Sequence, residues 1–277
     1  MAEIIKGKRL AGKIREKTKA RIDKLERPPG LAAILVGDDP ASHLYVSLKE
    51  KAAKEVGIYF EKIEFEAGVS EGKILKEIKK LNERDDIQGI LVQLPLPNQN
   101  EDKIINAIKL QKDVDGFHKK NRKCLKHGEP CLAPPVALAI MRLISATHQP
   151  LYEKNALIIA NNEIFAEPLI ELLKEQGVSG QFIKPDTEAI ETRTRAADII
   201  IVAIGRANFI TKEMIKEGGI IIDVGTNKVD GKIAGDVSKE AKAAAGFASP
   251  VPGGVGPLTV AYLLMNVFKA ANLQKSE

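Results

Sequence analysis

Continuous apolar runs of strand length recur along the chain, and segments with helical periodicity lie between them. Leu31 to Val36 and Asn155 to Ala160 are two such runs, and a strand buried on both faces needs this composition. Strands that alternate with helices pair in parallel through right-handed crossovers. The pattern therefore predicts an α/β fold whose ligand crevice lies beyond the carboxyl ends of the strands.

The same pattern gives the order of the expected elements. Strands are expected over 31–36, 58–65, 87–94, 155–160, 180–184, 198–204 and 219–224. Helices are expected over 8–26, after the turn at Pro40 as far as Gly57, over 71–84 and within 133–147. Two further helices are expected, one that starts at Pro168 and a last one that ends near Leu273. Pro168 is assigned to the opening of its helix because proline is favoured in the first turn. Two such series in 277 residues predict two domains.

Composition excludes several classes of protein. No apolar run approaches the roughly eighteen residues of a membrane-spanning helix, and the first residues lack the apolar core of a signal peptide, so a cytoplasmic protein is expected. The net charge of +5 comes from scattered lysine and arginine without aromatic interleaving, which argues against a nucleic-acid partner. Cys124, Cys131 and the four histidines have no metal-ligand spacing, so reduced thiols and no metal are expected.

One helix start carries the residues of greatest chemical interest. Ser42, Tyr45 and Lys49 are three and four residues apart, which places them on one helical face after the turn Gly37–Pro40. Asp39 or Ser42 is expected to cap this helix. An adjacent stripe is expected to pack against the sheet and to leave that face free: Leu44, Leu48, Ala52 and Val56.

Tyr45 and Lys49 would form a proton-handling pair if the lysine were removed from bulk water, because desolvation lowers a lysine pKa from about 10.4 towards neutrality. Most Tyr-x-x-x-Lys pairs on helices are solvated surface, and the spacing alone favours that interpretation. Gln93, at the end of the third expected strand, and the acidic turn over 112–116 are expected on the same side of the sheet.

Two loops in the second half are typical of ligand contacts. The loop over 161–167 leads from a strand into a helix, where a dinucleotide pyrophosphate would meet a helix N-terminus, although the sequence G-x-G-x-x-G is missing. The loop over 250–259 contains glycines that allow close backbone approach and prolines that fix its course. A plain interdomain linker is the alternative, but this composition is unlike that of a flexible linker.

Four long motifs follow one another in the order of a known family. They are Ser42 to Lys49, Gln-Leu-Pro-Leu-Pro from Gln93, Lys-Asp-Val-Asp-Gly-Phe-His from Lys112, and Pro-Val-Pro-Gly-Gly-Val-Gly-Pro-Leu-Thr from Pro250. Together they resemble the methylenetetrahydrofolate dehydrogenase/cyclohydrolase family, the bifunctional FolD proteins, over essentially the whole chain. The resemblance implies an N-terminal α/β folate domain over 1–120, completed by a C-terminal helix over 255–277, and a Rossmann-like NAD(P)-binding domain over 121–254.

The resemblance implies tetrahydrofolate derivatives as substrates and NADP as cofactor, with hydride transfer from methylenetetrahydrofolate followed by hydrolysis of the methenyl product. Lys49 would be the central catalytic group, Tyr45 would position substrate, Gln93 would hold the lysine, and Asp115 would bind the pterin. The implied substrate-binding residues are Ser42, Tyr45, Asp115, Pro252, Gly253, Gly254, Pro257 and Leu258. The implied cofactor-binding residues are Asn161, Asn162, Glu163, Lys184, Ala203, Gly205, Asp223, Gly225 and Thr259.

The sequence departs from the family in the nucleotide loop. The family usually has Gly-Arg-Ser-x-x-Val-Gly-x-Pro where this chain has the segment from Ala160 to Pro168, so two glycines and an arginine are replaced. The added methyl groups obstruct backbone approach to a pyrophosphate, and Glu163 adds negative charge. Lys184 would attract a ribose phosphate, whereas Asp186 would accept hydrogen bonds from an unphosphorylated ribose, so NADP, NAD or no cofactor stay open.

Several functional interpretations remain after these departures. One is a bifunctional enzyme with altered cofactor preference, and another is a cyclohydrolase that has lost useful dehydrogenase activity. The folate half retains the groups that hydrolysis needs, so hydrolysis is the better supported activity. A non-catalytic folate-binding paralogue and a dehydrogenase of another small molecule are further alternatives, although the missing glycine fingerprint argues against the last. The resemblance also implies a homodimer.

Overall fold

The computed structural model describes residues 2–274 and divides into two compact units, each built around one parallel sheet. The three-stranded unit contains Gly12–Pro135 and the chain from Val260 onward. The six-stranded unit contains residues 1–11 and Val136–Thr259. The α/β class and the two-domain organisation are therefore confirmed. The predicted boundaries differ from these units, because the structure groups residues 1–11 with the larger sheet and residues 121–135 with the smaller one.

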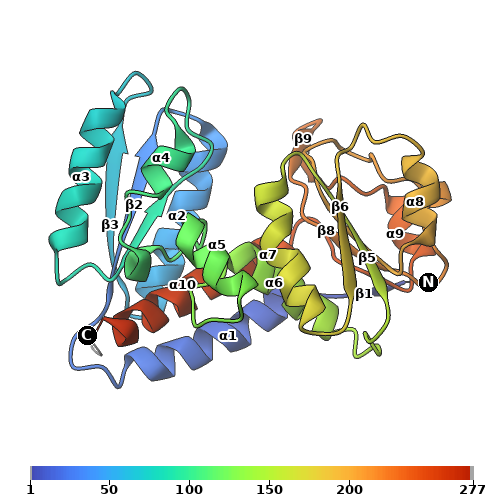
Figure 1. The fold of residues 1–277 in the computed structure, drawn as a ribbon, viewed down its shortest axis with the longest axis horizontal. Helices are drawn as coiled ribbons and strands as arrows, with labels where there is room; N and C mark the ends of the chain where they lie inside the picture. The colour runs from blue at the N-terminus through green and yellow to red at the C-terminus, as the bar shows by residue number, and fades with distance from the viewer. Residues whose placement is uncertain (1, 275–277) are drawn as a thin grey trace. The chain divides into compact units, whose positions relative to one another are not determined.

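The sheet of the three-stranded unit has the order β3-β2-β4, and all its pairs are parallel (Figure 1). Its strands are β2 (Gly30–Val36), β3 (Tyr59–Phe65) and β4 (Gly89–Val92). All seven residues of the central strand β2 are buried, as its continuous apolar run predicts. The strand β4 is shorter than the predicted 87–94.

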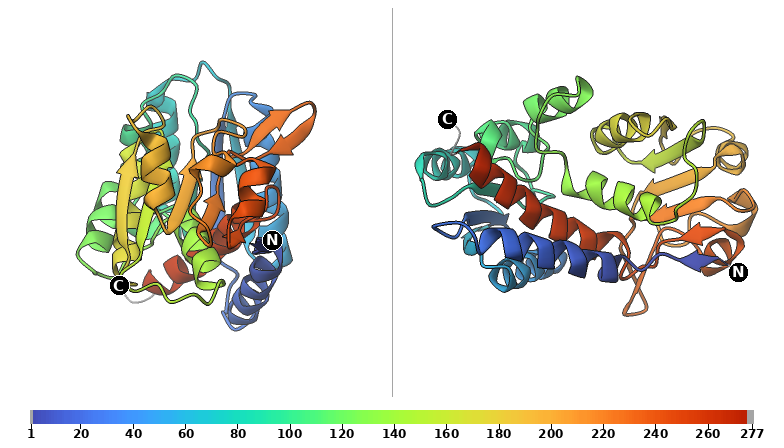
Figure 2. Two further views of the ribbon diagram at one scale, coloured as in Figure 1. Left: turned by 90° about the vertical axis from the view of Figure 1, so that its right-hand side faces the viewer. Right: turned by 90° about the horizontal axis from the view of Figure 1, so that it is seen from below.

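Helices pack on both faces of this sheet. Leu31, Ala33 and Leu35 of β2 face α2 and α10, whereas Ala32 and Ile34 face α3 and α4. The helical segments of the unit are α2 (Pro40–Glu55), α3 (Glu71–Glu83), α4 (Glu101–Ile105), the short η1 (Leu110–Lys112), α5 (Lys119–Lys126), α1 (Gly7–Ile22) from Gly12 onward and α10 (Val255–Leu273) from Val260 onward. Figure 2 shows α1 and α10 side by side. The C-terminal helix thus completes the core of the three-stranded unit.

The sheet of the six-stranded unit has the order β1-β11-β8-β7-β5-β6 and is also parallel throughout. Its strands are β1 (Glu3–Ile4), β5 (Asn155–Ala160), β6 (Ser179–Ile183), β7 (Ile199–Ala203), β8 (Ile220–Asp223) and β11 (Phe247–Ala248). Glu3 pairs with Phe247, and this pairing is why the first residues belong to this unit rather than to the three-stranded one.

Helices and a small hairpin surround this larger sheet. They are α6 (Pro135–Ser145), α7 (Glu163–Lys174), α8 (Ile190–Ala196), η2 (Lys212–Met214), the antiparallel pair β9 (Asn227–Val229) and β10 (Lys232–Ala234), and α9 (Lys239–Ala244). The prediction that Pro168 opens its helix is wrong, because α7 begins at Glu163 and Pro168 is buried inside it. Asn162 caps this helix instead, and its side chain provides the start signal that the proline was expected to give.

The predicted packing stripe of α2 is wrong in its first half. Leu44 and Leu48 are 54% and 47% exposed, whereas Val46 and Ala53 are fully buried. The helix approaches the sheet through small side chains and one valine, which leaves its two large leucines on the outer side. Within residues 2–274, no helix is both long and apolar enough to span a bilayer.

Candidate active site

The loop after β2 sets the start of α2. Gly37 has a φ of 81°, a backbone conformation that favours glycine, and it turns the chain from the strand into the helix. The carboxylate of Asp39 accepts a 2.8 Å hydrogen bond from the backbone N–H of Ser42, so Asp39 is the cap. The side chain of Ser42 is buried, with 4% of the residue exposed, so this residue supports the helix start more than it faces a ligand.

Lys49 and Gln93 meet in the three-stranded unit. The ammonium of Lys49 donates a 2.8 Å hydrogen bond to Oε1 of Gln93. The Gln93 amide nitrogen donates to the carbonyl of Leu94 at 2.7 Å, which keeps the amide oxygen turned towards the lysine. Tyr45, one turn before Lys49, is half-buried, as is the lysine itself. The predicted convergence of Lys49 and Gln93, which are 44 residues apart, is confirmed.

Burial and one opposite charge set the protonation of Lys49. Burial lowers the pKa of Lys49 below its ordinary 10.5, and the negative charge of Asp115 raises it in part. Burial likewise raises the pKa of Asp115, and the charge of Lys49 opposes that shift. Both groups are therefore held nearer to their neutral forms than they are in water. An amine with a lowered pKa can accept a proton at physiological pH, which a solvated lysine rarely does.

The turn that carries Asp115 is fixed by a buried carboxylate. Asp113 accepts hydrogen bonds from the N–H groups of Gly116 at 3.1 Å and His118 at 2.9 Å, and from Nδ2 of Asn121 at 2.8 Å. Burial raises the pKa of Asp113 to about 6. This supporting role was not predicted from the sequence, where Asp113 and Asp115 look alike.

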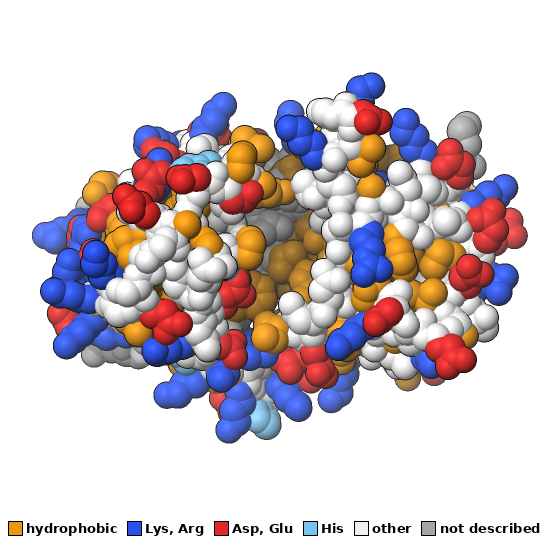
Figure 3. Space-filling view, turned by 90° about the horizontal axis from the view of Figure 1, so that it is seen from above, with side chains coloured by type: hydrophobic (Ala, Val, Ile, Leu, Met, Phe, Trp, Pro, Cys, Tyr) orange, Lys and Arg blue, Asp and Glu red, His pale blue; other side chains and the backbone are white. Residues whose placement is uncertain are grey.

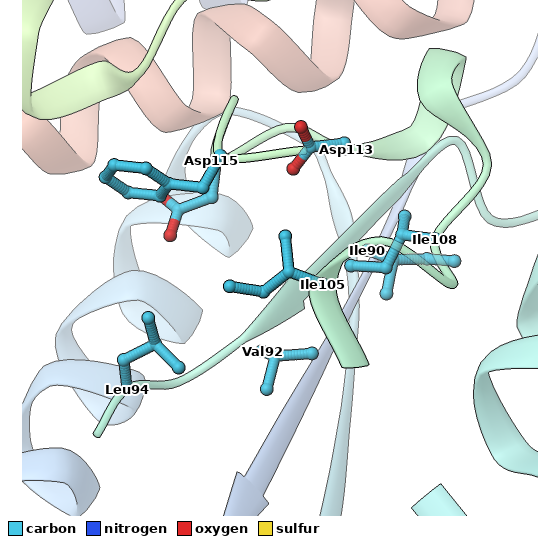
Figure 4. Close-up of a pocket in the computed structure, with 8 residues that line it drawn as sticks. Ile90, Val92, Leu94, Ile105, Ile108, Asp113 and Asp115 are labelled. Carbon is cyan, nitrogen blue, oxygen red and sulfur yellow. The ribbon is translucent and has the colours of Figure 1, made fainter. Parts of the chain in front are cut away.

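A small hollow adjoins Asp115 on the carboxyl side of β4. Figure 4 shows Asp113 and Asp115 on one side of it, with Val92, Leu94 and Ile105 across from them. The remaining lining consists of Ile90, Ile108 and Phe117. The hollow has a volume of about 10 Å³, enough for about one water molecule, so it surrounds Asp115 with apolar side chains but does not hold a flat heterocycle.

The other predicted substrate residues lie in the segment before and at the start of α10. Pro252 is exposed, Gly253 and Pro257 are half-buried, and Gly254 is buried. Gly254 leaves no room for a side chain, because an added Cβ would lie 2.5 Å from the carbonyl oxygen of Pro250. Leu258 is fully buried, so it belongs to the core and offers no surface to a ligand. This segment is therefore a rigid turn and not a flexible linker.

The loop between β5 and α7 exposes three of the predicted cofactor residues, Asn161, Asn162 and Glu163. The side chain of Asn162 accepts a 3.2 Å hydrogen bond from the N–H of Phe165, which uses one of the free amides of the helix start. Asn161 donates a 3.1 Å hydrogen bond to the carbonyl of Ile204, which follows β7. No lysine or arginine occurs from Ala160 to Pro168. This helix start offers amides to an anion but no cationic side chain.

Other predicted cofactor residues lie at neighbouring strand ends. Lys184 directly follows β6 and is exposed, Ala203 ends β7, and the exposed Gly205 follows it. Because β6, β5 and β7 are adjacent and parallel, these residues share one edge of the sheet with the loop before α7. Thr259 lies in α10 and its hydroxyl donates to the Val255 carbonyl at 3.2 Å.

Asp223 and Gly225 are structural in this arrangement. Asp223 is fully buried, pairs with Lys242 at 2.7 Å, and accepts hydrogen bonds from the N–H groups of Asp236 and Val237. Gly225 leaves room for a second carboxylate, since an added Cβ would lie 2.2 Å from Cγ of Asp236. The structure therefore does not present Asp223 to a ligand, in contrast to its predicted role.

Asp236 is a supporting residue that sequence analysis missed. Its buried carboxylate accepts hydrogen bonds from three consecutive N–H groups, of Ile204 at 2.7 Å, Gly205 at 3.1 Å and Arg206 at 2.8 Å. Three consecutive amides aimed at one anion form a nest, and here the protein fills it with its own carboxylate. The loop after β7 is thereby fixed. In the sequence, the one hint of close packing around Asp236 is its neighbour Gly235. The structure shows why a glycine stands there, since an added Cβ would clash with Asp223.

The charged side chains of the surface carry both signs. Basic and acidic side chains are interspersed on the face shown in Figure 3. Within residues 2–274, no group of three or more His, Cys, Asp or Glu side chains is placed to hold a metal ion. Cys124 and Cys131 are not joined in a disulfide.

Two family models together match most of the chain. The model for the catalytic domain of tetrahydrofolate dehydrogenase/cyclohydrolase matches residues 5–115, and that for its NAD(P)-binding domain matches residues 134–275. The bifunctional protein FolD of Streptococcus pyogenes (strain Manfredo) is 43% identical over 278 aligned residues, which cover 98% of each chain.

Solved structures agree with these matches. The bifunctional FolD enzyme of Campylobacter jejuni is 39% identical with a TM-score of 0.94, covering 99% of this chain and 100% of that one. The Trypanosoma brucei enzyme, solved with NADP and an inhibitor, is 31% identical with a TM-score of 0.94, covering 100% and 99%. With its sequence, fold and domain order all shared, this chain belongs to the tetrahydrofolate dehydrogenase/cyclohydrolase family.

Proposed function

We propose that this protein interconverts one-carbon derivatives of tetrahydrofolate, as a methenyltetrahydrofolate cyclohydrolase with NADP-dependent methylenetetrahydrofolate dehydrogenase activity. The observation that carries the proposal is the half-buried ammonium of Lys49, held at 2.8 Å on Gln93 and acted on by the charge of Asp115. Family membership supplies the substrate class, and the named relatives supply the two activities.

Hydrolysis is the step in which side chains of the protein take part most directly, through proton transfer. A water molecule adds to the methenyl carbon and loses a proton to the neutral amine of Lys49. The resulting ammonium returns that proton to the ring nitrogen as its bond to the carbon breaks, and the second proton of the water leaves to solvent. Gln93 keeps the lysine nitrogen in one position through both transfers. Tyr45, one helical turn away, positions the substrate.

Asp115 orients the substrate in this proposal. A carboxylate accepts two parallel hydrogen bonds from the donor edge of a pterin, which fixes the ring plane. The apolar residues Val92, Leu94 and Ile105 line the water-sized hollow beside Asp115 and keep the surroundings of its carboxylate apolar. Orientation of this kind lowers the barrier of both reactions, because the reacting atoms start close to their final geometry.

The six-stranded unit fits a dinucleotide in topology, since helix α7 starts at the carboxyl end of β5 in a parallel sheet. NADP, when bound, supplies the hydride acceptor. Asn161 and Asn162 would lie near its phosphates, and Lys184 near a ribose phosphate. Glu163 in the first turn of α7 repels phosphate, and the loop supplies no compensating cation.

A second candidate function follows from that loop, namely a cyclohydrolase with weak or lost dehydrogenase activity. The specific observation in its favour is that side chains of the protein already accept hydrogen bonds from backbone N–H groups of the two loops. Asn162 uses the Phe165 N–H, and Asp236 uses three N–H groups of the loop after β7.

We further propose that the protein is a cytoplasmic homodimer. The cytoplasmic location rests on composition and the dimer on family resemblance. Light scattering of the purified protein tests the dimer.

The proposed function is tested by assaying the purified protein for hydrolysis of methenyltetrahydrofolate and for NADP reduction by methylenetetrahydrofolate. Lys49→Ala is expected to lower the hydrolysis rate by about 100-fold or more, because a positioned acid/base group contributes about 100-fold to 10,000-fold. Lys51→Ala, two residues along the same helix and exposed, is the matched control. Folate binding without either turnover would instead support a non-catalytic paralogue.

A further inference from the structure

The C-terminal helix α10 buries one amide among apolar side chains. Asn266 is fully buried, and its neighbours on the helix, Leu263, Leu264, Val267 and Ala270, belong to the core of the three-stranded unit. Both hydrogens of its amide are used, on the carbonyl oxygen of Val114 at 2.9 Å and on that of Ala133 at 2.9 Å. These partners are separated from Asn266 by more than 130 residues in sequence.

The two carbonyls belong to segments that meet at the Asp115 turn. Val114 lies between Asp113 and Asp115, so the amide of Asn266 holds the peptide that directly precedes the Asp115 residue. Ala133 lies in the segment that packs against Gly116, where an added Cβ would lie 2.5 Å from the Leu132 carbonyl oxygen. One side chain therefore connects α10, the Asp115 turn and the segment behind that turn.

The buried amide of Asn266 has both a cost and a gain in stability. Within the described residues, Oδ1 of Asn266 is buried without a hydrogen-bond partner, which costs about 1–3 kcal/mol for such an atom. A leucine has the same branched outline but a larger side chain; it would be apolar like the surrounding leucines and valines and would remove that unpaired oxygen. It would also leave two carbonyls without their donor. What the asparagine provides, and a leucine does not, is a fixed position for Val114.

We propose that Asn266 is a positioning residue for the reaction: its buried amide fixes the turn that carries Asp115 and thereby sets the distance between the Asp115 carboxylate and Lys49. This inference rests on the proposed function. Asp113 holds the same turn from its other side through Gly116 and His118. Asp115 thus lies between two sets of buried polar contacts. Asn266 makes one of them to Val114, and Asp113 makes the other to Gly116 and His118.

Asn266→Leu tests the proposal in the full-length protein. The variant keeps the branched outline of the side chain, enlarges it and removes both donors, so the turn is expected to shift. A misplacement of about 1 Å can cost about 100-fold in rate. We expect kcat for methenyltetrahydrofolate hydrolysis to fall by about 10-fold to 100-fold. Because Asp115 is the charged group that raises the pKa of Lys49, its displacement also moves the lysine-dependent rise of the pH–rate profile to lower pH.

Gln274→Ala is the matched control for lost hydrogen bonds. Gln274 follows the same helix, and its amide donates to two backbone carbonyls, of Gln88 at 2.9 Å and Gln111 at 3.2 Å. Its loss removes the same kind and number of bonds but leaves Val114 in place. We expect a lowered Tm in both variants, and a changed kcat and pH profile only in Asn266→Leu.

The outcomes separate the two proposals. An inactive wild-type protein would overturn the proposed function, whereas an active wild type with an unchanged kcat and pH profile in folded Asn266→Leu would overturn the role of Asn266. If Asn266→Leu does not fold, Asn266→Ser is measured at a temperature where circular dichroism shows native signal. Its hydroxyl reaches at most one carbonyl, so a kcat equal to that of Gln274→Ala would contradict the proposal.

Discussion

The two ligand-facing regions of this protein are built in different ways. In the three-stranded unit, Lys49, Gln93 and Asp115 come from three separate segments, and burial moves the pKa of both charged groups towards neutrality. In the six-stranded unit, the loop before α7 exposes Asn161, Asn162 and Glu163 and contains no basic side chain. The first region depends on side-chain chemistry and the second on backbone geometry.

This difference between the two regions indicates which of the two activities depends on each of them. Hydrolysis requires a group that accepts and returns a proton, and the three-stranded unit supplies one in a partly desolvated position. Hydride transfer requires orientation of a cofactor, so it depends on how firmly the six-stranded unit holds a dinucleotide. Changes in the first region should therefore alter hydrolysis, and changes in the second should alter nucleotide affinity.

After Lys49→Ala, the largest effect is expected from Asp115→Asn. Loss of a hydrogen bond to a charged group costs about 1.5–3 kcal/mol, which corresponds to a fall in kcat/KM for hydrolysis of about 10-fold to 100-fold. Without the negative charge, the pKa of Lys49 falls further, so activity that rises with pH begins at lower pH. A pH–rate profile measures both effects. Asp102→Asn, on the exposed surface of α4, is expected to change neither.

An intermediate effect is expected from Asp236→Asn. The amide keeps one oxygen for the N–H groups of Ile204 to Arg206 and turns an NH2 group towards the others, so the loop after β7 loosens. Loss of about one hydrogen bond weakens dinucleotide binding by about 5-fold to 10-fold. Calorimetric titration with NADP measures this change. A matching fall in hydrolysis would break the separation between the two regions.

The smallest effect is expected from Glu163→Gln. A charge in the first turn of a helix is worth about 0.3–1 kcal/mol, so its removal should tighten NADP and NAD binding by about 2-fold to 5-fold. Glu171→Gln, in the second half of α7, is the matched control. Equal affinities in wild type and Glu163→Gln would mean that the phosphates do not approach this helix start.

The sequence predicted those features that follow from local composition or from long motifs. The buried run of β2 and the convergence of Lys49 and Gln93 are confirmed, because parallel strands bring their carboxyl ends to one edge. The opening of α7 at Pro168 and the packing of Leu44 on the sheet were wrong. Proline is tolerated in more than one position of a helix, and the helical period alone does not tell which of two adjacent stripes packs inward.

The supporting residues were beyond sequence analysis for a different reason. Asp113, Asp236 and Asn266 act on backbone groups through burial, and no spacing rule marks a buried carboxylate or amide in a single sequence. Asp223 illustrates the reverse case, since the family resemblance implied a cofactor contact whereas its carboxylate lies inside the protein. Which polar residues face inward is decided by tertiary packing.

The proposed hydrolysis depends most on a pKa of Lys49 that burial lowers below that of an ordinary lysine. The most direct measurement is an NMR titration of the Lys49 side-chain nitrogen in protein labelled with 15N-lysine, with Lys49→Arg identifying the signal. We expect a titration midpoint below the 10.5 of an ordinary lysine, and a still lower midpoint in Asp115→Asn. A midpoint at or above 10.5, unaffected by Asp115→Asn, would contradict the account.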